Sequence, residues 1–146
     1  MTPLTFVQDN VSVSRRGVVR GLHFQHPQGQ GKLVGVLAGA AWDVAVDVRR
    51  GSPTFGRWVT QELTGANQRQ LWIPPGFAHG FQALTDDVVF QYKCTDTYRP
   101  ECERTVLWSD PALAIPWPIS AAVVAPKDAA APLLERLPAE HLPAYG

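Results

Sequence analysis

The chain has 146 residues, of which 13 are basic and 13 acidic, so its formal net charge is zero. A balanced charge creates no overall positive field, and we therefore expect neither nucleic acid nor an anionic membrane as a partner. The longest apolar runs are far short of the roughly 20 residues that a membrane-spanning helix needs. Residues 1–10 also lack the basic-then-apolar order of a signal peptide, so we expect a cytoplasmic protein. The length fits one domain, residues 1–146, with a substantial core.

Short apolar segments punctuated by turn-forming residues dominate the sequence. The 13 prolines and 12 glycines fall between stretches rich in Val, Leu, Phe and Trp, which is typical of short strands joined by tight turns. The pattern predicts an all-β fold. Its expected strands cover residues 17–24, 32–38, 41–49, 57–63, 69–73, 78–84 and 88–94.

Three of these strands carry side chains suited to proton transfer: His23, Lys32 and Tyr92. A histidine supplies a base near neutral pH, a lysine supplies a positive charge, and a tyrosine supplies a weak acid. Together they suit chemistry next to a carbonyl group. Core packing with a hydrogen-bonded hydroxyl is the alternative for Tyr92 considered alone.

The strand expected at 41–49 has two different faces. One face carries Trp42, Val44 and Val46, while the other carries Asp43 and Asp47. If the second face lines a barrel interior, the two acids are site residues. If it faces water, they are ordinary solvated charges, and this strand alone leaves both readings open.

The segment IPPGFAHGF at residues 73–81 carries the strongest local signal. Two prolines and a glycine predict a tight turn, after which His79 enters a strand. The segment fits part of the second cupin motif, in which the histidine points into a jelly-roll barrel; a buried structural histidine is the alternative. The stretch that would hold a cupin's other metal ligands has His23 without a second histidine at that spacing, so we expect no metal.

The C-terminal part follows a different pattern. Residues 129–136 contain enough Ala, Leu and Glu for a short helix, with Asp128 as its expected N-cap and Pro132 in its first turn. Residues 137–146 are expected to lie along the surface or to fray. Cys94 and Cys102 match no zinc spacing and are expected to be reduced thiols.

Many ordered motifs along the chain resemble the dTDP-4-dehydrorhamnose 3,5-epimerase family. They are FVQDN at 6–10, RGLHFQ at 20–25, GKLV at 31–34, WDVAVD at 42–47, SPTFG at 52–56, LWIPPGFAHGF at 71–81, YKCTD at 92–96, Tyr98, PECER at 100–104 and WSDPAL at 108–113. The match extends from about residue 6 to residue 128, which is nearly the whole chain.

The resemblance implies a cupin-type double-stranded β-helix, or jelly roll, with a short C-terminal helix. It also implies a homodimer without metal or cofactor that acts on a dTDP-linked 4-keto-6-deoxy sugar in deoxysugar formation, of which rhamnose is an example. By motif matching, His23 is the base, Asp128 orients it, Lys32 stabilises the enolate, and Tyr92 is the acid on the opposite face.

The same resemblance implies a set of substrate-binding residues. Arg20 would clamp a diphosphate oxygen, since a guanidinium meets two oxygens at once. The others implied are Gln8, Asn10, Tyr98, Asp43 and His79, the last two close to the reacting ring. The alternatives are a strand-edge charge for Arg20, loop capping for the two amides and surface exposure for Tyr98. Four further arginines remain open between phosphate contacts and solvated charges: Arg49, Arg57, Arg69 and Arg104.

One departure from the family concerns the start of the chain. Family members usually begin a few dozen residues before the position of Phe6, with a segment that reaches across the dimer and helps to hold the nucleotide. We therefore expect the grip on the nucleotide and the geometry of the dimer to be altered, with the proton-transfer residues all present. A mis-chosen or trimmed start, a natural short form with another nucleotide preference, and a weakly active domain are the three explanations left open. The alternatives to a 3,5-epimerase are a mono-epimerase of a deoxysugar pathway, a cupin that binds a sugar nucleotide without turnover, and a cupin-type metal oxygenase.

Overall fold

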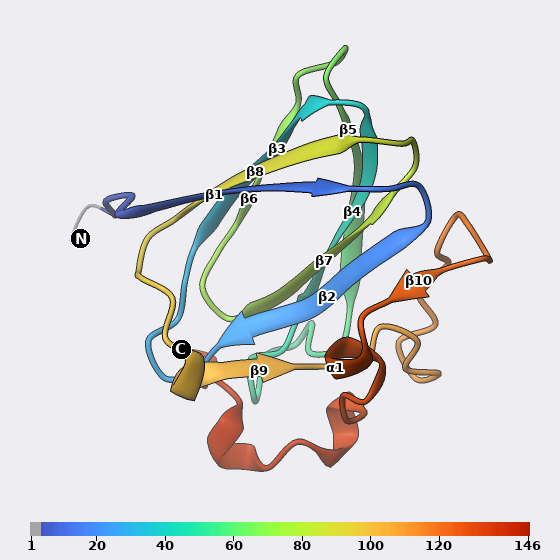
Figure 1. The fold of residues 1–146 in the computed structure, drawn as a ribbon. Helices are drawn as coiled ribbons and strands as arrows, with labels where there is room; N and C mark the ends of the chain where they lie inside the picture. The colour runs from blue at the N-terminus through green and yellow to red at the C-terminus, as the bar shows by residue number, and fades with distance from the viewer. Residues whose placement is uncertain (1–3) are drawn as a thin grey trace.

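Residues 4–146, described by a computed structural model, form two facing β-sheets (Figure 1). The four-stranded sheet has the order β1 (Gln8–Ser14), β8 (Val88–Cys94), β3 (Lys32–Ala38) and β6 (Gln70–Ile73). The six-stranded sheet has the order β10 (Val123–Val124), β2 (Val18–Gln25), β7 (Phe77–Ala83), β4 (Ala40–Asp47) and β5 (Trp58–Thr64), with β9 (Glu103–Thr105) also paired to β2. Neighbouring strands are antiparallel except β10 and β2, which are parallel. This arrangement confirms the predicted all-β jelly roll.

The six-stranded sheet is covered on both faces. Between the sheets, buried side chains of both sheets pack into one cluster that includes Val34, Phe81 and Phe90. A second cluster joins the alternate residues of β4, such as Val44 and Val46, to side chains that follow the last long strand. Both faces of β4 are therefore buried. One face carries apolar residues, and the other carries polar residues that are enclosed between the two sheets.

The expected strands are confirmed to within two residues at each end. Three strands were missed: β1, β9 and β10. The first of these has Asp9 and Asn10, which disfavour strands, and its Val11 and Val13 are exposed. Pairing with β8 holds β1 in place, and the pattern of a single sequence does not reveal that β8 is the partner strand.

The predicted helix at 129–136 is wrong in position. The helix α1 covers Pro126–Ala129, and a separate 3₁₀ turn covers Leu134–Arg136. Asp128 lies inside α1, whose N-cap is Ala125. The helix stops because Pro132 restricts the residue before it, and because the carbonyl of Pro132 and the N–H of Leu134 bond to Leu107 and Asp110 instead. No helix within residues 4–146 is long and apolar enough to span a membrane.

Neither acid of β4 is a solvated charge, and only Asp43 lies behind the cleft between the sheets, since Asp47 does not line it. Asp43 and Asp47 are both buried. Asp47 accepts hydrogen bonds from Arg49, Ser52 and Thr54 and closes the turn that follows β4. Burial opposes this charge, but the hydrogen bonds hold the pKa of Asp47 far below its usual range.

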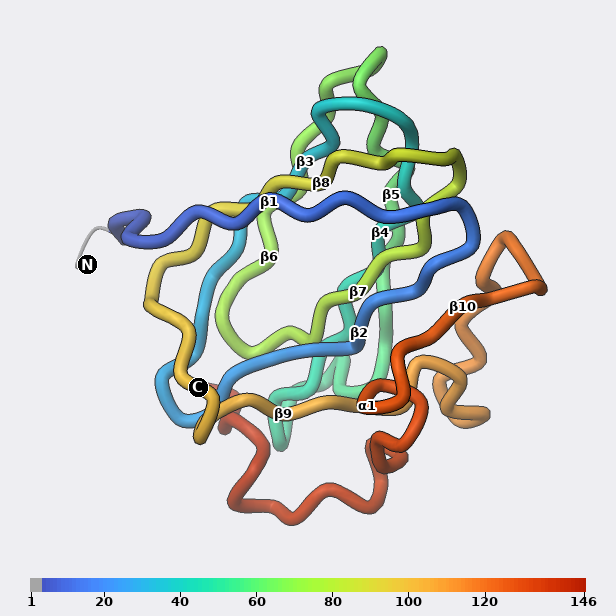
Figure 2. Tube along the Cα trace, viewed as in Figure 1, coloured from blue at the N-terminus to red at the C-terminus, as the bar shows by residue number. Residues whose placement is uncertain are grey.

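The C-terminal residues pack against the barrel and do not fray. Figure 2 shows them looping along one side of the molecule beyond α1. Leu134 and Leu142 are buried in the cluster on the outer face of the six-stranded sheet. The backbone of Arg50 exchanges hydrogen bonds with Pro143 and Tyr145. The same segment carries Asp128, so its docking positions a residue of the candidate site.

We expect Leu134→Ala to lower the free energy of unfolding by about 2–4 kcal/mol, because it opens a cavity beneath the docked segment. Urea unfolding measures this loss. The matched control is Leu4→Ala, whose side chain is 61% exposed, with an expected change of less than about 0.5 kcal/mol. Equal effects of the two substitutions would contradict the packing role of the segment.

Candidate active site

A cleft with a volume of about 350 Å³ lies between the two sheets and gathers most of the predicted site residues. Seven of them line it: Asn10, Arg20, His23, Lys32, His79, Tyr92 and Tyr98. Two more lie behind its histidines: Asp128 behind His23, and Asp43 behind His79. Gln8 lines an adjoining hollow with Asn10 and Tyr98. The structure therefore brings together all ten.

His23 and Asp128 form a short hydrogen-bonded pair. His23 Nε2 is 2.7 Å from Asp128 Oδ1, and the His23 side chain is 32% exposed to the cleft. The other oxygen, Oδ2, accepts the backbone N–H of Gly21 at 3.2 Å. Burial would raise the pKa of Asp128, but the bond to His23 and the charge on that ring lower it overall. An ionised carboxylate so placed fixes the orientation of the imidazole and leaves its other nitrogen for the cleft.

A close approach of β2 and β7 sets this geometry. Gly21 has φ +132°, and a Cβ atom there would lie 2.7 Å from Gly80 Cα. The register of the two strands shifts between Arg20 and His23, which places His23 opposite His79. Glycine is required at position 21 both for its backbone conformation and for the missing side chain.

His79 and Asp43 form a second and more deeply buried pair. His79 Nε2 is 2.6 Å from Asp43 Oδ1, and the side chains are 7% and 0% exposed. The His79 ring stacks on Phe90 with 5.8 Å between the ring centroids. His79 lines the cleft, whereas Asp43 does not.

Lys32 and Tyr92 extend into the cleft from the opposite sheet. The Lys32 ammonium nitrogen lies 5.7 Å from the centre of the Tyr92 ring, within range of a cation–π interaction. Burial lowers the pKa of Lys32 and raises that of Tyr92. The raised pKa of Tyr92 keeps its phenol protonated near neutral pH.

The remaining predicted residues surround the mouth of the cleft. Arg20 Nε donates to Ser14 Oγ at 2.9 Å. Gln8 Nε2 donates to Asn10 Oδ1 at 3.3 Å, and Gln8 Oε1 accepts the backbone N–H of Tyr98 at 2.7 Å. These bonds hold two amides and a half-exposed aromatic ring beside the charged groups. None of the four arginines left open by the sequence lines the cleft.

Some lining residues were missed. Glu103 Oε2 accepts hydrogen bonds from Tyr98 Oη and from Lys127 Nζ, each at 2.8 Å. These two missed residues, unlike others such as Ser12, lay within or beside motifs already recognised for the site, since Lys127 precedes Asp128 and Glu103 belongs to the segment at 100–104. The alternation of β1 was the available signal for Ser12, which lies two residues beyond Asn10 on the same face.

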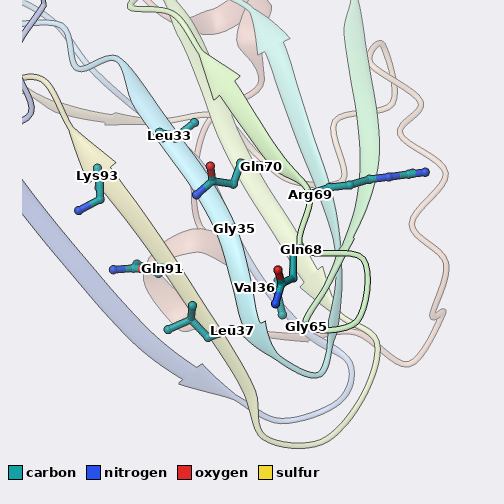
Figure 3. A pocket seen from close by; sticks show the side chains of 10 residues that line it. All are labelled: Leu33, Gly35, Val36, Leu37, Gly65, Gln68, Arg69, Gln70, Gln91 and Lys93. Atoms are coloured by element: carbon teal, nitrogen blue, oxygen red, sulfur yellow. The ribbon is translucent and has the colours of Figure 1, made fainter.

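A second hollow, of about 360 Å³, lies on the outer face of the four-stranded sheet (Figure 3). Gln91 and Lys93 flank Tyr92 on β8 and therefore point away from the cleft. Gln70 and Gln91 lie on either side of β3, and Arg69 extends away from them. This hollow has no histidine or carboxylate in its lining. It therefore lacks a base, and the cleft between the sheets is the candidate active site.

The chain was compared with protein families and known proteins. The family model described as dTDP-4-dehydrorhamnose 3,5-epimerase matches residues 1–136. The chain belongs to this family. It is 58% identical over 117 residues to the dTDP-4-dehydrorhamnose 3,5-epimerase of Pseudomonas aeruginosa, and 55% identical over 127 residues to that of Neisseria gonorrhoeae. These alignments cover 80% and 86% of this chain.

The epimerase fold is equally evident from a solved structure. The dTDP-6-deoxy-D-glucose-3,5-epimerase of Legionella pneumophila, in complex with dTDP-4-keto-L-rhamnose, matches with a TM-score of 0.97 and 57% identity. That match covers 99% of this chain and 78% of the Legionella chain. The chain spans 65% of the length of the Pseudomonas relative and 39% of that of the Neisseria relative.

Within residues 4–146, no group of three or more His, Cys, Asp or Glu side chains is placed to hold a metal ion. Cys94 and Cys102 are free and buried.

We expect Gly21→Ala to destabilise the protein by about 3 kcal/mol or more, because the new methyl group meets the backbone of β7 at an unfavourable φ. Urea unfolding measures the loss. Gly51→Ala is the matched control: its φ is +85°, but a Cβ atom there meets nothing within 4 Å. We expect this control to cost only the backbone strain, about 1 kcal/mol. Equal losses would refute a steric constraint at the crossing of β2 and β7.

Proposed function

We propose that this chain epimerises a dTDP-linked 4-keto-6-deoxy sugar at C3, C5 or both, as a dTDP-4-dehydrorhamnose 3,5-epimerase does. One observation carries the proposal: a carboxylate-oriented histidine and a lysine–tyrosine pair meet in one cleft from opposite sheets. Family membership and a relative solved with dTDP-4-keto-L-rhamnose support the same substrate class.

The first step is removal of a proton next to the ketone. A ketone at C4 acidifies the protons on C3 and C5, but a side-chain base needs the developing enolate to be stabilised. In the proposed mechanism His23 takes the proton, and Asp128 stabilises the resulting imidazolium at 2.7 Å. Lys32 supplies the positive charge for the enolate oxygen.

The second step is delivery of a proton to the other face of the same carbon. Tyr92 extends from β8, whereas His23 extends from β2 in the facing sheet. The phenol is kept protonated by the raised pKa that burial causes. The proton passes from the phenol oxygen to carbon as the enolate returns to the ketone, which inverts the centre. Solvent then exchanges protons with both residues before the next cycle.

The rest of the cleft fits the remainder of a nucleotide sugar. Arg20 is the proposed clamp for a diphosphate oxygen, and Lys127 adds a second cation at the mouth. Asn10 and Gln8 present amides, while Tyr98 presents an exposed aromatic ring for a sugar or base to pack against.

We also propose that two copies associate through the outer face of the four-stranded sheet. Val13, Leu37 and Trp72 are exposed there or at its edge, and the hollow of Figure 3 lies among the same strands. Exposed apolar side chains that gather on one face of a protein favour its association with another subunit. The cytoplasm is the proposed compartment, because a reducing environment suits the two unpaired thiols.

Solvent exchange tests the reaction. An epimerase carries deuterium from heavy water into C3, C5 or both of dTDP-4-keto-6-deoxyglucose, which NMR or mass spectrometry detects. We expect His23→Ala to reduce incorporation by at least about 10³-fold, since it removes the base. We expect Tyr92→Phe to retain proton exchange but to lose inversion. His141→Ala, in a 3₁₀ turn outside the cleft, is the matched control and should leave incorporation unchanged.

The outcomes separate the competing functions. No incorporation by the unaltered protein, together with measurable binding of the nucleotide sugar, would leave a binding protein without turnover. Label at only one carbon would identify a mono-epimerase. Full activity of His23→Ala would refute the assignment of the base.

A further inference from the structure

Asp43 has an oxygen atom for which the proposed mechanism provides no role. Its carboxylate is fully buried, and Oδ1 is held by His79 at 2.6 Å. Oδ2 is buried and has no hydrogen-bond partner within residues 4–146. A buried carboxylate oxygen without a donor is costly unless a nearby positive charge compensates it.

Lys32 is a buried positive charge without a paired anion, just as Asp43 has a buried oxygen without a donor. Its side chain is buried, at 8% exposure of the residue, and no carboxylate of the described residues lies within ion-pair distance of its nitrogen. The ring of Tyr92 is a neutral neighbour at 5.7 Å. An ammonium group in such an interior loses its proton readily unless an anion faces it.

The two residues are electrostatically coupled across the barrel. Burial lowers the pKa of Lys32, and Cys94, then Asp43 and then Glu103 oppose that effect. Burial also raises the pKa of Asp43, while His79 and then Lys32 oppose it. The titratable groups around Lys32 are Cys94 and Tyr92 on β8, Asp43 on β4, Glu103 on β9, His23 on β2 and His79 on β7. Arg20 on β2, Lys127 on α1 and Tyr98 line the same cleft. Of these, Asp43 is the fully buried carboxylate, where screening by water is weakest.

We propose that Asp43 is a positioning residue that keeps the Lys32 amine protonated, acting as its counter-ion across the barrel while His79 holds the carboxylate in place. The catalytic consequence rests on the proposed function: an enolate stabiliser must carry its charge before the base removes a proton. Asp43 acts through Lys32 and His79 and does not itself reach the cleft.

The charge state of Lys32 is directly measurable. The chain has three lysines, at positions 32, 93 and 127, so lysine-labelled protein gives three side-chain NMR signals, assigned with Lys93→Arg and Lys127→Arg. Asp43→Asn removes the charge and keeps an oxygen that accepts from His79. We expect the titration midpoint of Lys32 to fall by about 1 pH unit or more, a tenfold loss of proton affinity.

The matched control is Asp9→Asn, which removes an exposed carboxylate 3.0 Å from Lys93. It should leave the midpoint of Lys32 in place. A Lys32 midpoint that does not move in Asp43→Asn would overturn the proposal. If the His79 ring loses a proton in Asp43→Asn while the Lys32 midpoint stays in place, the charge of Asp43 is balanced by His79 and not by Lys32, which would also overturn the proposal.

Kinetics then tests the consequence. Activity that needs the ammonium form is lost as pH rises through the Lys32 midpoint, so Asp43→Asn should move the alkaline limb of kcat/KM to lower pH by the same amount. An alkaline limb that stays in place while the NMR midpoint moves would overturn the catalytic consequence. If the unaltered protein does not turn over the sugar, the proposed function fails. The midpoint measured by NMR still decides whether Asp43 controls the protonation of Lys32.

A thermodynamic cycle covers the case in which Asp43→Asn folds poorly. Lys32→Met removes the positive charge and leaves the Asp43 carboxylate without a counter-ion. Asp43→Asn removes the negative charge and leaves the Lys32 ammonium without a counter-ion. The double variant has neither charge. We expect the double variant to lose less in unfolding temperature than the sum of the two single variants. Additive losses would overturn the coupling.

Discussion

The close crossing of β2 and β7 at Gly21 and Gly80 is the constraint on which the site depends. With no side chain at either position, the two backbones approach until a Cβ atom would collide. The register shift that accompanies the crossing sets His23 beside His79. The N–H of Gly21 also binds Asp128, so the same contact anchors the carboxylate that orients His23. A contact between two backbones thus determines where the imidazole ring lies.

Much of the fold follows from local patterns, because each predicted strand is a short apolar segment between turn-forming residues. The strand at β1 escaped detection since its pairing with β8 depends on a partner 80 residues away in the sequence. The helix was misplaced for a related reason. Alanine and leucine favour a helix at 129–136, but tertiary hydrogen bonds to Leu107 and Asp110 take the backbone groups that a helix would use.

The sequence predicted which residues gather at the candidate site more fully than it predicted the contacts among them. Motif matching named all ten predicted residues that the structure gathers around the cleft or beside it. It gave no indication that Asp43 would be sealed behind His79 with one oxygen unpaired, or that Glu103 would join Tyr98 to Lys127. Such relations depend on which side chains meet after folding. The roles assigned to the individual residues stay predictions until the exchange experiments are done.

The docking of the C-terminal segment has a consequence for the order in which the protein matures. During synthesis the chain emerges from its N-terminus, so every long strand leaves the ribosome before Asp128 does. At that stage the chain holds His23 but not yet the carboxylate that orients it. The His23–Asp128 pair therefore forms only when Asp128 reaches the crossing of β2 and β7. Until Asp128 has docked, the residue that we propose as the base has an imidazole ring with no carboxylate to align it.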